Sequence, residues 1–361
     1  MSIICFGEIM ARIAPPHHHK ILQGFPGPAE ITFGGSEANV CASLAMMGQS
    51  TRFVSALPSH ALAEACLNQL RGFGVDVSHT QRDDGRLGLY FVEKGANQRP
   101  STVIYDRENS SINHFDLNQV NWNDVFDGAQ WFHCSGITPA LSRSCYETVL
   151  FLVKEAAQRN IPVSCDLNFR NKLWRWDDSC APKELARQCM GKILHHVDVV
   201  IGNEEDASDV LDIHPQGTDV EQGKLSAEAY ISVAQQIGMR FPKLRQVAIT
   251  LRESLSATQN NWGAMLYSCA TQQTDFAPLK NGDYSPYPIT NIVDRVGGGD
   301  SFAAGLIFAL LSKEYGDCAS AISFAVAASC LCHSISGDYN YSSREEVEAL
   351  MKGRASGRVQ R

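Results

Sequence analysis

The chain has 361 residues, of which 44% are hydrophobic, so it can form one large core with a smaller piece inserted or appended. Its formal net charge of −8 is spread without long runs, which argues against a nucleic-acid-binding protein, because such proteins carry a basic patch. The twelve cysteines include no C-x-x-C pair and indicate neither a zinc site nor a disulfide framework, so we expect reduced thiols in a cytosol.

The N-terminus enters an apolar strand pattern at once and lacks the basic segment that opens a signal peptide. No run of about 18 apolar residues, the length that spans a bilayer, occurs in the chain. We therefore predict a cytoplasmic protein that binds a small molecule, with neither a membrane nor a nucleic acid as a partner.

The first strand is predicted at residues 3–9 and ends at Gly7-Glu8. The loop that follows contains three consecutive histidines, His17 to His19. They suggest a metal site, but neighbouring histidines point in different directions and these have no distant partner ligands. We interpret the segment as a plain proline-containing loop.

A helix is predicted to begin near Ser36 and to stop at Gly48. Its first turn has two interpretations. Ser36 could be only the N-cap. Alternatively, two glycines followed by polar side chains gather free amides and hydrogen-bonding groups suited to grip a polyol, and we favour this interpretation. The residues concerned are Gly34, Gly35, Glu37 and Asn39.

The next part of the chain has shorter apolar runs and more charge. Two alternating segments, 87–94 and 102–107, predict a hairpin with one exposed face, and hence a small sheet apart from the main core that could act as a lid. Tyr90, Tyr105 and Arg107 either point from it toward a ligand or pack across the hairpin. Arg107 is the strongest ligand-binding candidate of the three.

Beyond residue 125 apolar strands alternate regularly with helical segments. This alternation predicts right-handed crossovers and an α/β fold with a parallel sheet covered by helices on both faces. The strands are predicted near 129–134, 161–166, 197–202 and 244–251, the helices near 143–159, 182–195 and 225–239, and two more helices after 312, one of them at 319–331.

Polar residues come directly after three of these strands. Because an open parallel sheet binds ligands at the carboxyl ends of its strands, we expect these residues to share one cleft, although loops are often polar without a function. They are Asp166, Asn168 and Arg170 after one strand, Asn203 to Asp206 after the next, and Thr250 and Arg252 after the third.

The most informative stretch runs from Asp294 to Phe308 and reads D-R-V-G-G-G-D-S-F-A-A-G-L-I-F. Gly297 to Gly299 allow the backbone to approach a ligand with its amides turned inward, and an apolar helix follows. A phosphate or a charged transition state would bind there, and Asp300 could take a proton from a hydroxyl. The alternative is a tight turn with an N-cap.

These motifs resemble the ribokinase-type (PfkB) sugar kinases over nearly the whole chain, and among them the 2-keto-3-deoxygluconate kinases. The stretch from Asp294 to Asp300 matches the family's signature and is the most specific match. The stretches that favour the ketodeoxygluconate kinases are Asp166-Leu167-Asn168-Phe169-Arg170 with Leu173-Trp174, and Tyr105-Asp106-Arg107. Gly7-Glu8 and the segment from Gly34 to Asn39 also match.

The resemblance implies one ribokinase-like domain over residues 1–361, with a Rossmann-like core and a β-sheet lid formed by segments near 10–33 and 86–115. It also implies ATP and magnesium, allows potassium near Asp294, and suggests a homodimer or higher homo-oligomer. By this pattern Asp300 is the catalytic base, and the amides of Gly297, Gly298 and Gly299 form the anion hole.

The remaining site residues follow from the same pattern. Two arginines are a natural receiver for the carboxylate of a sugar acid, because guanidinium and carboxylate form a bidentate, charge-assisted pair. The candidates for substrate binding are Gly34, Gly35, Glu37, Asn39, Tyr90, Tyr105, Arg107, Asp166, Asn168 and Arg170; those for nucleotide binding are Asn203, Thr250, Arg252, Gly297 and Gly299.

The chain departs from the family pattern at two places. The signature commonly has threonine after its first aspartate, where this chain has Arg295 and Val296, and Arg295 either helps to bind ATP or faces solvent. The family's magnesium-associated Asn-x-x-Glu is Asn203 to Asp206 here. Asp206 is one methylene shorter than glutamate, so we expect Asn203 and Asp206 to reach the metal through water.

No other nucleotide motif competes with this interpretation. The nearest approach to a P-loop, residues 217–225, has the wrong spacing, and no Gly-x-Gly-x-x-Gly follows the first strand. We expect ATP-dependent phosphorylation of a hydroxyl of 2-keto-3-deoxygluconate. The alternatives are a fructokinase or another sugar kinase of this family, and a sugar-sensing protein that has lost catalysis. The only support for a further alternative, a nicotinamide oxidoreductase, is the glycine-rich α/β character of the sequence.

Overall fold

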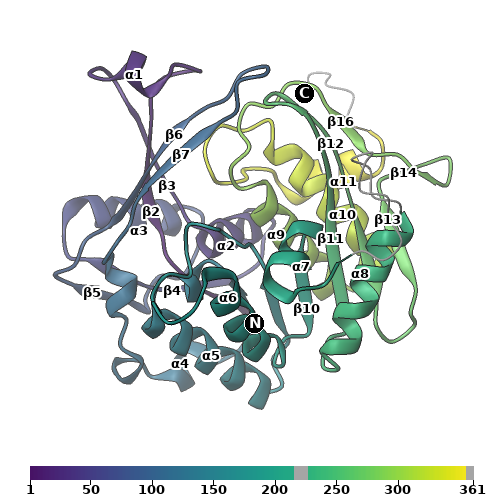
Figure 1. Cartoon of the computed structure of the whole chain (residues 1–361), viewed down its shortest axis with the longest axis horizontal. Coiled ribbons are helices and arrows are strands. Elements are labelled where there is room, and N and C mark those ends of the chain that lie inside the picture. Colours follow the sequence, from purple (N-terminus) through teal and green to yellow (C-terminus); the bar gives the residue numbers. More distant parts are fainter. Residues whose placement is uncertain (215–226, 355–361) are drawn as a thin grey trace. The chain divides into compact units, whose positions relative to one another are not determined.

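The computed structural model describes residues 1–214 and 227–354 (Figure 1). Residues 217–225, compared above with a P-loop, lie outside the described residues, as does the end of the basic tail. Within the described ranges no helix has both the length and the apolar character needed to cross a membrane.

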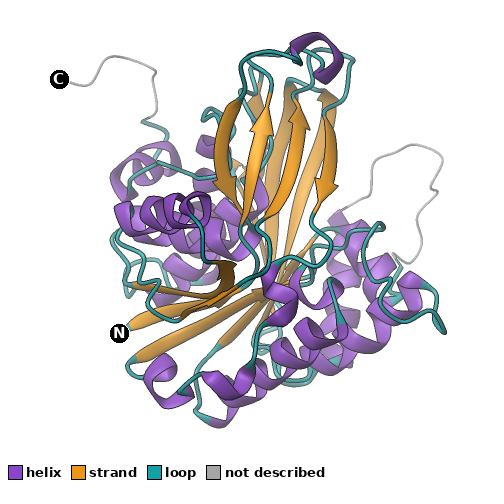
Figure 2. Ribbon diagram, turned by 90° about the vertical axis from the view of Figure 1, so that its left-hand side faces the viewer, coloured by secondary structure: helices purple, strands orange, loops and turns teal. Residues whose placement is uncertain are grey.

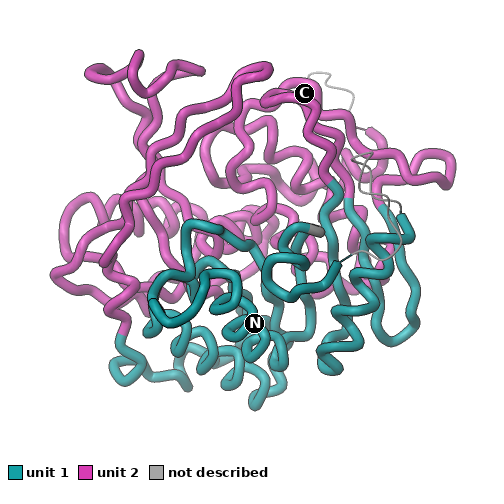
Figure 3. Tube along the Cα trace, in the orientation of Figure 1, with its two compact units in different colours: residues 1–4, 116–251, 264–276 teal, residues 5–115, 252–263, 277–361 magenta. Residues whose placement is uncertain are grey.

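The chain forms two compact units, each made of three separate segments (Figure 3). Unit 1 comprises residues 1–4, 116–251 and 264–276, and unit 2 comprises residues 5–115, 252–263 and 277–361. The fold is α/β, and the largest sheet in the described part of the chain has ten mostly parallel strands. This confirms the predicted fold class.

Unit 1 contains the regular strand–helix alternation expected from the sequence. Its strands β8 to β11 are neighbours in chain order and pair in parallel, with Ser135 opposite Asp166 and Gly202 opposite Ile249. The strands are β8 Ala129–Ser135, β9 Val163–Asp166, β10 Val199–Gly202 and β11 Gln246–Ser256, and the helices are α4 Trp122–Phe126, α5 Arg143–Gln158, α6 Pro182–Leu194, α7 Glu204–Leu211 and α8 Ala227–Arg240.

These strands and helices have the residues expected for their burial and for their ends. Strand β10 is fully buried and rich in β-branched residues, as expected of a strand covered on both faces. Ser142 accepts a hydrogen bond from the Cys145 amide and so caps α5, and Pro182 begins α6, where its missing amide hydrogen is not needed. Helix α8 was predicted at 225–239 and is described from Ala227.

Unit 2 is built around two apolar helices, α9 and α10, which lie against each other. Gly305 makes the close contact possible, because a Cβ at this position would lie 2.9 Å from the Cα of Ala325. The longer helices described in this unit are α2 Ser36–Met46, α3 Ala61–Gly72, α9 Gly298–Leu311, α10 Cys318–Cys332 and α11 Arg344–Met351, and its parallel strands β4 Thr51–Pro58 and β5 Thr80–Asp83 pair with each other.

The predicted hairpin belongs to a separate four-stranded sheet, which we call the small sheet. Its order is β3-β2-β6-β7, with β2 and β6 parallel and both outer pairs antiparallel. Figure 2 shows the four strands side by side, with the short helix α1 beyond their ends. The bounds are β2 Met10–Ala14, α1 Ile21–Gly24, β3 Glu30–Gly34, β6 Gly88–Glu93 and β7 Thr102–Asp106.

The remaining elements are short or join the two units along the chain. Strand β11 and the following strand β12 each have residues in both units. The bounds are β1 Ser2–Phe6, β12 Gln259–Ser268, β13 Thr274–Ala277, β14 Leu279–Lys280, β15 Asp283–Tyr284 and β16 Tyr287–Ile289, with short 3-10 helices at Ser111–His114, Leu117–Gln119 and Thr138–Ala140.

Candidate active site

Asp300 lies in the first turn of α9, where two side chains from α2 hold its carboxylate. The Ser36 hydroxyl donates to one oxygen at 2.8 Å and the Asn39 amide donates to the other at 2.7 Å. An ionised carboxylate is purely an acceptor, so both donors suit its charged form and fix its orientation. Ser36 is therefore not the N-cap of α2. That position is Gly35, which has no side chain to cap with.

The glycine turn, residues 297–299, leads directly into α9. Gly297 is the N-cap and has a φ of 81°, in the left-handed region that favours glycine. A Cβ on it would also lie 2.1 Å from the carbonyl oxygen of Asp338. The Ser329 hydroxyl donates to the Gly298 carbonyl at 2.6 Å. The first amides of this 14-residue helix have no carbonyl partner within the helix, so the turn is suited to bind an anion.

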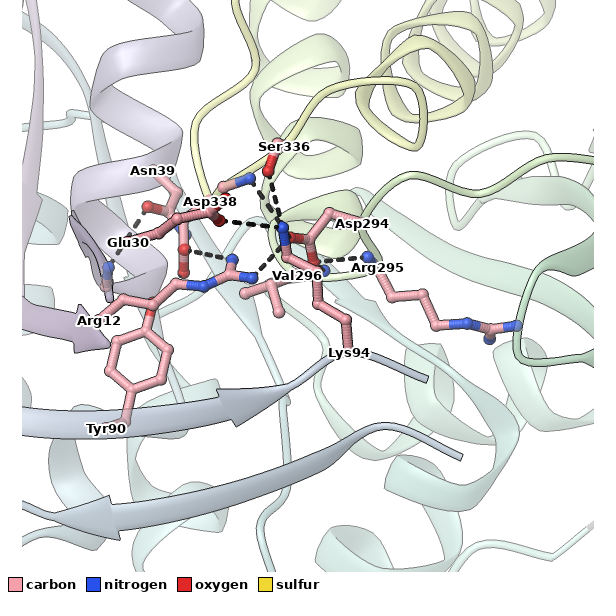
Figure 4. A network of polar contacts seen from close by, with 12 residues as sticks. Arg12, Glu30, Asn39, Tyr90, Lys94, Asp294, Arg295, Val296, Ser336 and Asp338 are labelled. Carbon is pink, nitrogen blue, oxygen red and sulfur yellow. Dashed lines mark hydrogen bonds and ion pairs between the residues drawn. The ribbon is translucent and has the colours of Figure 1, made fainter. Parts of the chain in front are cut away.

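A buried ion network surrounds this turn (Figure 4). Arg12 of β2 donates to Asp294 at 2.5 Å and to Asp338 at 2.8 Å, and Tyr90 of β6 donates its hydroxyl to Asp338. Asp294 also accepts the backbone amides of Arg295 at 2.8 Å and of Val296 at 3.2 Å. The small sheet and the start of the glycine turn are thus joined through charged groups.

Arg295, one of the departures from the family pattern, is half-buried and bonded to backbone. Its guanidinium donates to the carbonyls of Ser256, at the end of β11, and of Ala257; the bond to Ala257 is 2.8 Å long. Burial lowers the pKa of Arg295, and nearby Arg252 acts in the same direction. The side chain therefore anchors one loop of unit 2 to another.

The backbone near Gly34 and Gly35 is too crowded for side chains. A Cβ on Gly34 would lie 2.4 Å from an Asp338 carboxylate oxygen, and one on Gly35 would lie 2.0 Å from the Glu8 carbonyl. Glu37 is completely buried, and the Asn39 side-chain oxygen accepts the Gly35 amide at 3.3 Å. This part of the predicted sugar site is therefore a packed, preformed structure.

Arg107 is buried and paired with Glu8. Its Nε donates to Glu8 Oε2 at 2.8 Å and its Nη2 donates to the same oxygen, while the Ser110 hydroxyl donates to Glu8 Oε1. The Tyr105 ring, 42% exposed, lies 5.5 Å from the Arg107 guanidinium and stacks on Tyr90 with a centroid distance of 6.1 Å. The three ligand candidates of the hairpin therefore lie side by side.

The candidates of unit 1 also come together. Asp166 and Asn168 are buried and Arg170 is exposed, with its guanidinium donating to the Phe169 carbonyl at 2.9 Å. Thr250 donates to the Gly202 carbonyl at 3.4 Å. Asp166 ends β9, and Asn168 and Arg170 follow it, as predicted. Thr250 was expected after its strand but lies inside β11, which continues to Ser256 because its exposed second half still pairs as a strand. Arg252, an exposed residue, belongs to unit 2.

Asn203 and Asp206 form a capping box at the start of α7. Asn203 accepts the Asp206 amide at 2.8 Å, and Asp206 accepts the amides of Asn203 at 3.2 Å and of Phe169 at 2.9 Å. Burial raises the pKa of the Asp206 carboxyl, against these amide donors. Both carboxylate oxygens thus already accept backbone amides. Within residues 1–214 and 227–354 no three His, Cys, Asp or Glu side chains are grouped to hold a metal ion.

Comparison with known proteins now gives the family. The model for the pfkB family carbohydrate kinases matches residues 1–239 and 252–344. The chain belongs to this family. It is a carbohydrate kinase.

Its relatives include kinases for 2-dehydro-3-deoxy sugar acids. A 2-dehydro-3-deoxygalactonokinase from Haloferax volcanii is 27% identical over 356 residues, covering 99% of this kinase and 98% of the relative. A 2-dehydro-3-deoxygluconokinase from Thermoproteus tenax is 29% identical, covering 91% and 89%. The crystal structure of a Thermotoga maritima 2-dehydro-3-deoxygluconokinase is 42% identical, with a TM-score of 0.87 and coverage of 98% and 100%.

Three residues of the site have no assigned role in the sequence-based prediction: Arg12, Asp338 and Glu8. Arg12 carries a detectable signal, because it is a charge inside an apolar strand and a buried charge needs a partner. Its partners Asp294 and Asp338 are more than 280 residues away in the kinase chain, and no local pattern identifies them. Glu8 follows Gly7 in a stretch that matches the family, but the sequence does not show which arginine pairs with Glu8.

Proposed function

We propose that this carbohydrate kinase transfers the γ-phosphoryl group of ATP to a hydroxyl of 2-keto-3-deoxygluconate, also called 2-dehydro-3-deoxygluconate. The observation that carries the proposal is the geometry of Asp300, which is held by Ser36 and Asn39 in the first turn of α9 beside the glycine turn. The similarity of the whole chain to proteins named 2-dehydro-3-deoxygluconokinase and 2-dehydro-3-deoxygalactonokinase supports the choice of substrate.

In the proposed reaction Asp300 accepts the proton of the sugar hydroxyl, and the oxygen of that hydroxyl attacks the γ-phosphorus of ATP. The new O–P bond forms as the bond to the bridging oxygen of ADP breaks. The amides of Gly297, Gly298 and Gly299 would stabilise the charge on the phosphoryl oxygens. We expect general-base catalysis by Asp300 to accelerate the transfer step by roughly 10²- to 10⁴-fold.

ATP is the proposed donor, with Asn203, Thr250, Arg252, Gly297 and Gly299 as candidate nucleotide contacts. Magnesium would supply charge neutralisation on the phosphates when it arrives with the nucleotide. The capping contacts of Asn203 and Asp206 do not fit direct coordination, so we derive no step through the metal. Asp294 pairs with Arg12, so potassium near Asp294 enters the proposal only as an optional cofactor.

The proposed carboxylate receivers, Arg170 and Arg107, differ in setting. The exposed Arg170 can turn toward a ligand, whereas Arg107 is buried against Glu8 and is held in one orientation. Arg107 would therefore offer a fixed donor and Arg170 an adaptable one. Gly34, Gly35, Glu37, Asn39, Tyr90, Tyr105, Asp166 and Asn168 remain the other proposed contacts of the sugar acid.

We also propose that the kinase works in the cytoplasm as a homodimer joined through the small sheet. Ile31, Ile13, Phe91 and Ile104 lie opposite one another across all four strands and so share one face. Ile31 is 57% exposed and Ile104 is 50% exposed. An apolar row of this kind is suited to pack against the same row of a second copy.

The test is a substrate panel at equal concentration with ATP and magnesium: 2-keto-3-deoxygluconate, 2-keto-3-deoxygalactonate, fructose and ribose. We expect the two acids to be phosphorylated much faster than the neutral sugars, because only they pair with the arginines. Faster phosphorylation of fructose than of the two acids would mean that the proposed substrate is wrong and that the protein is a fructokinase. Absence of turnover with all four, despite ligand binding, would favour a sugar sensor.

A further inference from the structure

In the buried network around Arg12, two carboxylates share one guanidinium. Asp294 and Asp338 both bind the single guanidinium of Arg12, and all three side chains are at most 4% exposed. Lys94, 11% exposed, lies 4.0 Å from Asp294 and contributes a second positive charge at the edge. Removing one partner from such a buried network leaves an uncompensated charge, which is expensive.

The two carboxylates are placed where they control the glycine turn. Asp294 precedes the turn and accepts the amides of Arg295 and Val296, and also the amide of Gly337 at 3.3 Å. Asp338 follows Gly337, and its carbonyl oxygen lies against Gly297. The loop before α9 and the loop after α10 are therefore tied together at the turn, and Arg12 bonds to both.

The same network reaches the proposed sugar site. Asp338 accepts the hydroxyl of Tyr90, and its carboxylate leaves no room for a side chain at Gly34. Arg12 and Tyr90 are opposite each other in neighbouring strands of the small sheet. One guanidinium thus connects the strands that carry sugar-binding candidates to the turn that would bind the phosphoryl group.

We propose that Arg12 is a positioning residue for phosphoryl transfer, which holds the glycine turn in register with the small sheet through Asp294 and Asp338. This inference rests on the proposed function, because it assumes that the turn binds the transferred group. A displacement of about 1 Å at a reacting centre can reduce turnover by about 100-fold. The role therefore predicts a kinetic defect and not only a loss of stability.

The first test compares Arg12→Met with the wild type and with Arg12→Lys. Methionine keeps much of the length and removes the charge, so we expect kcat to fall about 100-fold and KM for sugar to rise less. Lysine restores the charge but cannot present a planar fork to two carboxylates, so we expect partial recovery, to about one tenth of wild-type kcat.

Arg52→Met is the matched control. Arg52 is also a strand arginine of unit 2 in an ion pair, with Asp76 at 3.1 Å, and Asp76 belongs to neither the glycine turn nor the small sheet. We expect its kcat within about twofold of the wild type, even if the melting temperature falls. The kcat is counted per functional site, from the stoichiometry of nucleotide binding.

Hydrogen exchange provides a readout that does not depend on activity. The amides of Arg295, Val296 and Gly337 donate to Asp294, so in Arg12→Met we expect them to exchange at least tenfold faster, with no such change in Arg52→Met. If Arg12→Met does not fold, Arg12→Lys and Asp338→Asn are measured in its place, with the same expectation at smaller amplitude.

The outcomes separate the two proposals. Faster exchange together with lower kcat supports the positioning role. Unchanged exchange, or a folded Arg12→Met enzyme with near-normal kcat per site, overturns it. If the wild type phosphorylates none of the four sugars, the proposed function fails. Faster exchange at the three amides would then show that Arg12 holds the glycine turn but has no role in phosphoryl transfer, which also overturns the inference as stated.

Discussion

Asp300, which we propose as the catalytic base, has a carboxylate held in one orientation. Two donors from one turn of α2 hold its oxygens at 2.8 and 2.7 Å, so its orientation is fixed before a sugar arrives. We predict that Asp300→Asn retains the fold and sugar binding but lowers kcat by about 10²- to 10⁴-fold, because an amide cannot accept the proton.

This prediction is checked by steady-state kinetics alongside isothermal titration with the sugar acid. Asp317→Asn is the control: Asp317 caps α10, and asparagine caps equally well, so its kcat should not change. A near-normal kcat in Asp300→Asn would exclude the base assignment.

Arg107 and Arg170 should differ in what their loss does to the fold. Removing Arg107 leaves Glu8 buried without its cation, and we expect Arg107→Met to cost about 3–5 kcal/mol in the free energy of unfolding. Arg170→Met should cost less than about 0.5 kcal/mol, because the residue is exposed. Both variants should lower kcat/KM for the sugar acid more than for fructose.

Chemical denaturation and the two-sugar comparison measure these effects. The double variant Glu8→Gln, Arg107→Met removes both charges and should recover much of the lost stability without recovering acid preference. An equal kinetic loss for acid and neutral sugar would mean that the arginines do not receive a carboxylate.

At the residue scale the sequence identifies groups whose chemistry is local. Asp300 and the three glycines are adjacent in the chain, so one stretch is enough to propose a shared role for them. Arg12 could not be assigned in this way, because its meaning depends on two aspartates that only the folded chain brings to it. Ser36 was open to a capping interpretation for the same reason, since its acceptor, Asp300, is 264 residues away.

At the element scale the small sheet has two faces with different tasks. Arg12 and Tyr90 lie on the face that joins the ion network, whereas Ile31 and Ile104 lie on the other. Reversing the polarity of the second face should therefore leave the network intact. We predict that Ile31→Lys combined with Ile104→Lys converts the proposed dimer to a monomer.

Analytical ultracentrifugation of the double variant tests this, with Met239→Lys as the control, because Met239 is 73% exposed on α8 of unit 1. The double variant should sediment as a monomer and the control like the wild type. A wild type that is itself monomeric at micromolar concentration would exclude the proposed interface.

Element prediction succeeded where the period of the apolar residues is unambiguous. Helices α5 and α6 and strands β8 to β10 begin and end within a few residues of the expected positions. Strand β11 continues to Ser256, beyond the expected end at 251, with exposed residues in its second half. A polar strand segment of that kind depends on its neighbours, and no apolar periodicity marks it.

At the scale of the whole molecule, the chain is interleaved in a way that composition does not reveal. Four of the five boundaries between the units fall inside strands: after Ile4 in β1, Leu251 in β11, Gly263 in β12 and Phe276 in β13. Strand residues replace the glycine- and proline-rich linkers that usually mark such boundaries. The sequence could therefore predict an α/β chain with a small sheet, but not this division.

The stability contribution of one buried carboxyl, Asp338, and the turnover of the enzyme should respond to acid in opposite directions. Burial raises the pKa of the Asp338 carboxyl to about 6, against the lowering effect of Arg12. Between about pH 4 and pH 6 the folded chain then binds more protons at this site than the unfolded chain does. This contribution to the free energy of unfolding is fully present below about pH 4 and is lost as pH rises through 6, by about 3 kcal/mol at most.

The contribution is isolated by comparing the wild type with Asp338→Asn, because Asp206 is shifted in the same direction in both proteins. We expect the wild type to gain stability relative to Asp338→Asn when urea denaturation is repeated at pH 7, 6 and 5. A relative loss of stability on acidification would mean that Arg12 lowers the pKa of Asp338 below its ordinary value. Over the same range protonation removes a negative partner of Arg12, so wild-type kcat should fall as the stability contribution of Asp338 grows. Protonation of Asp338 would then favour the folded state at this one site while it weakens the contact that we propose positions the glycine turn.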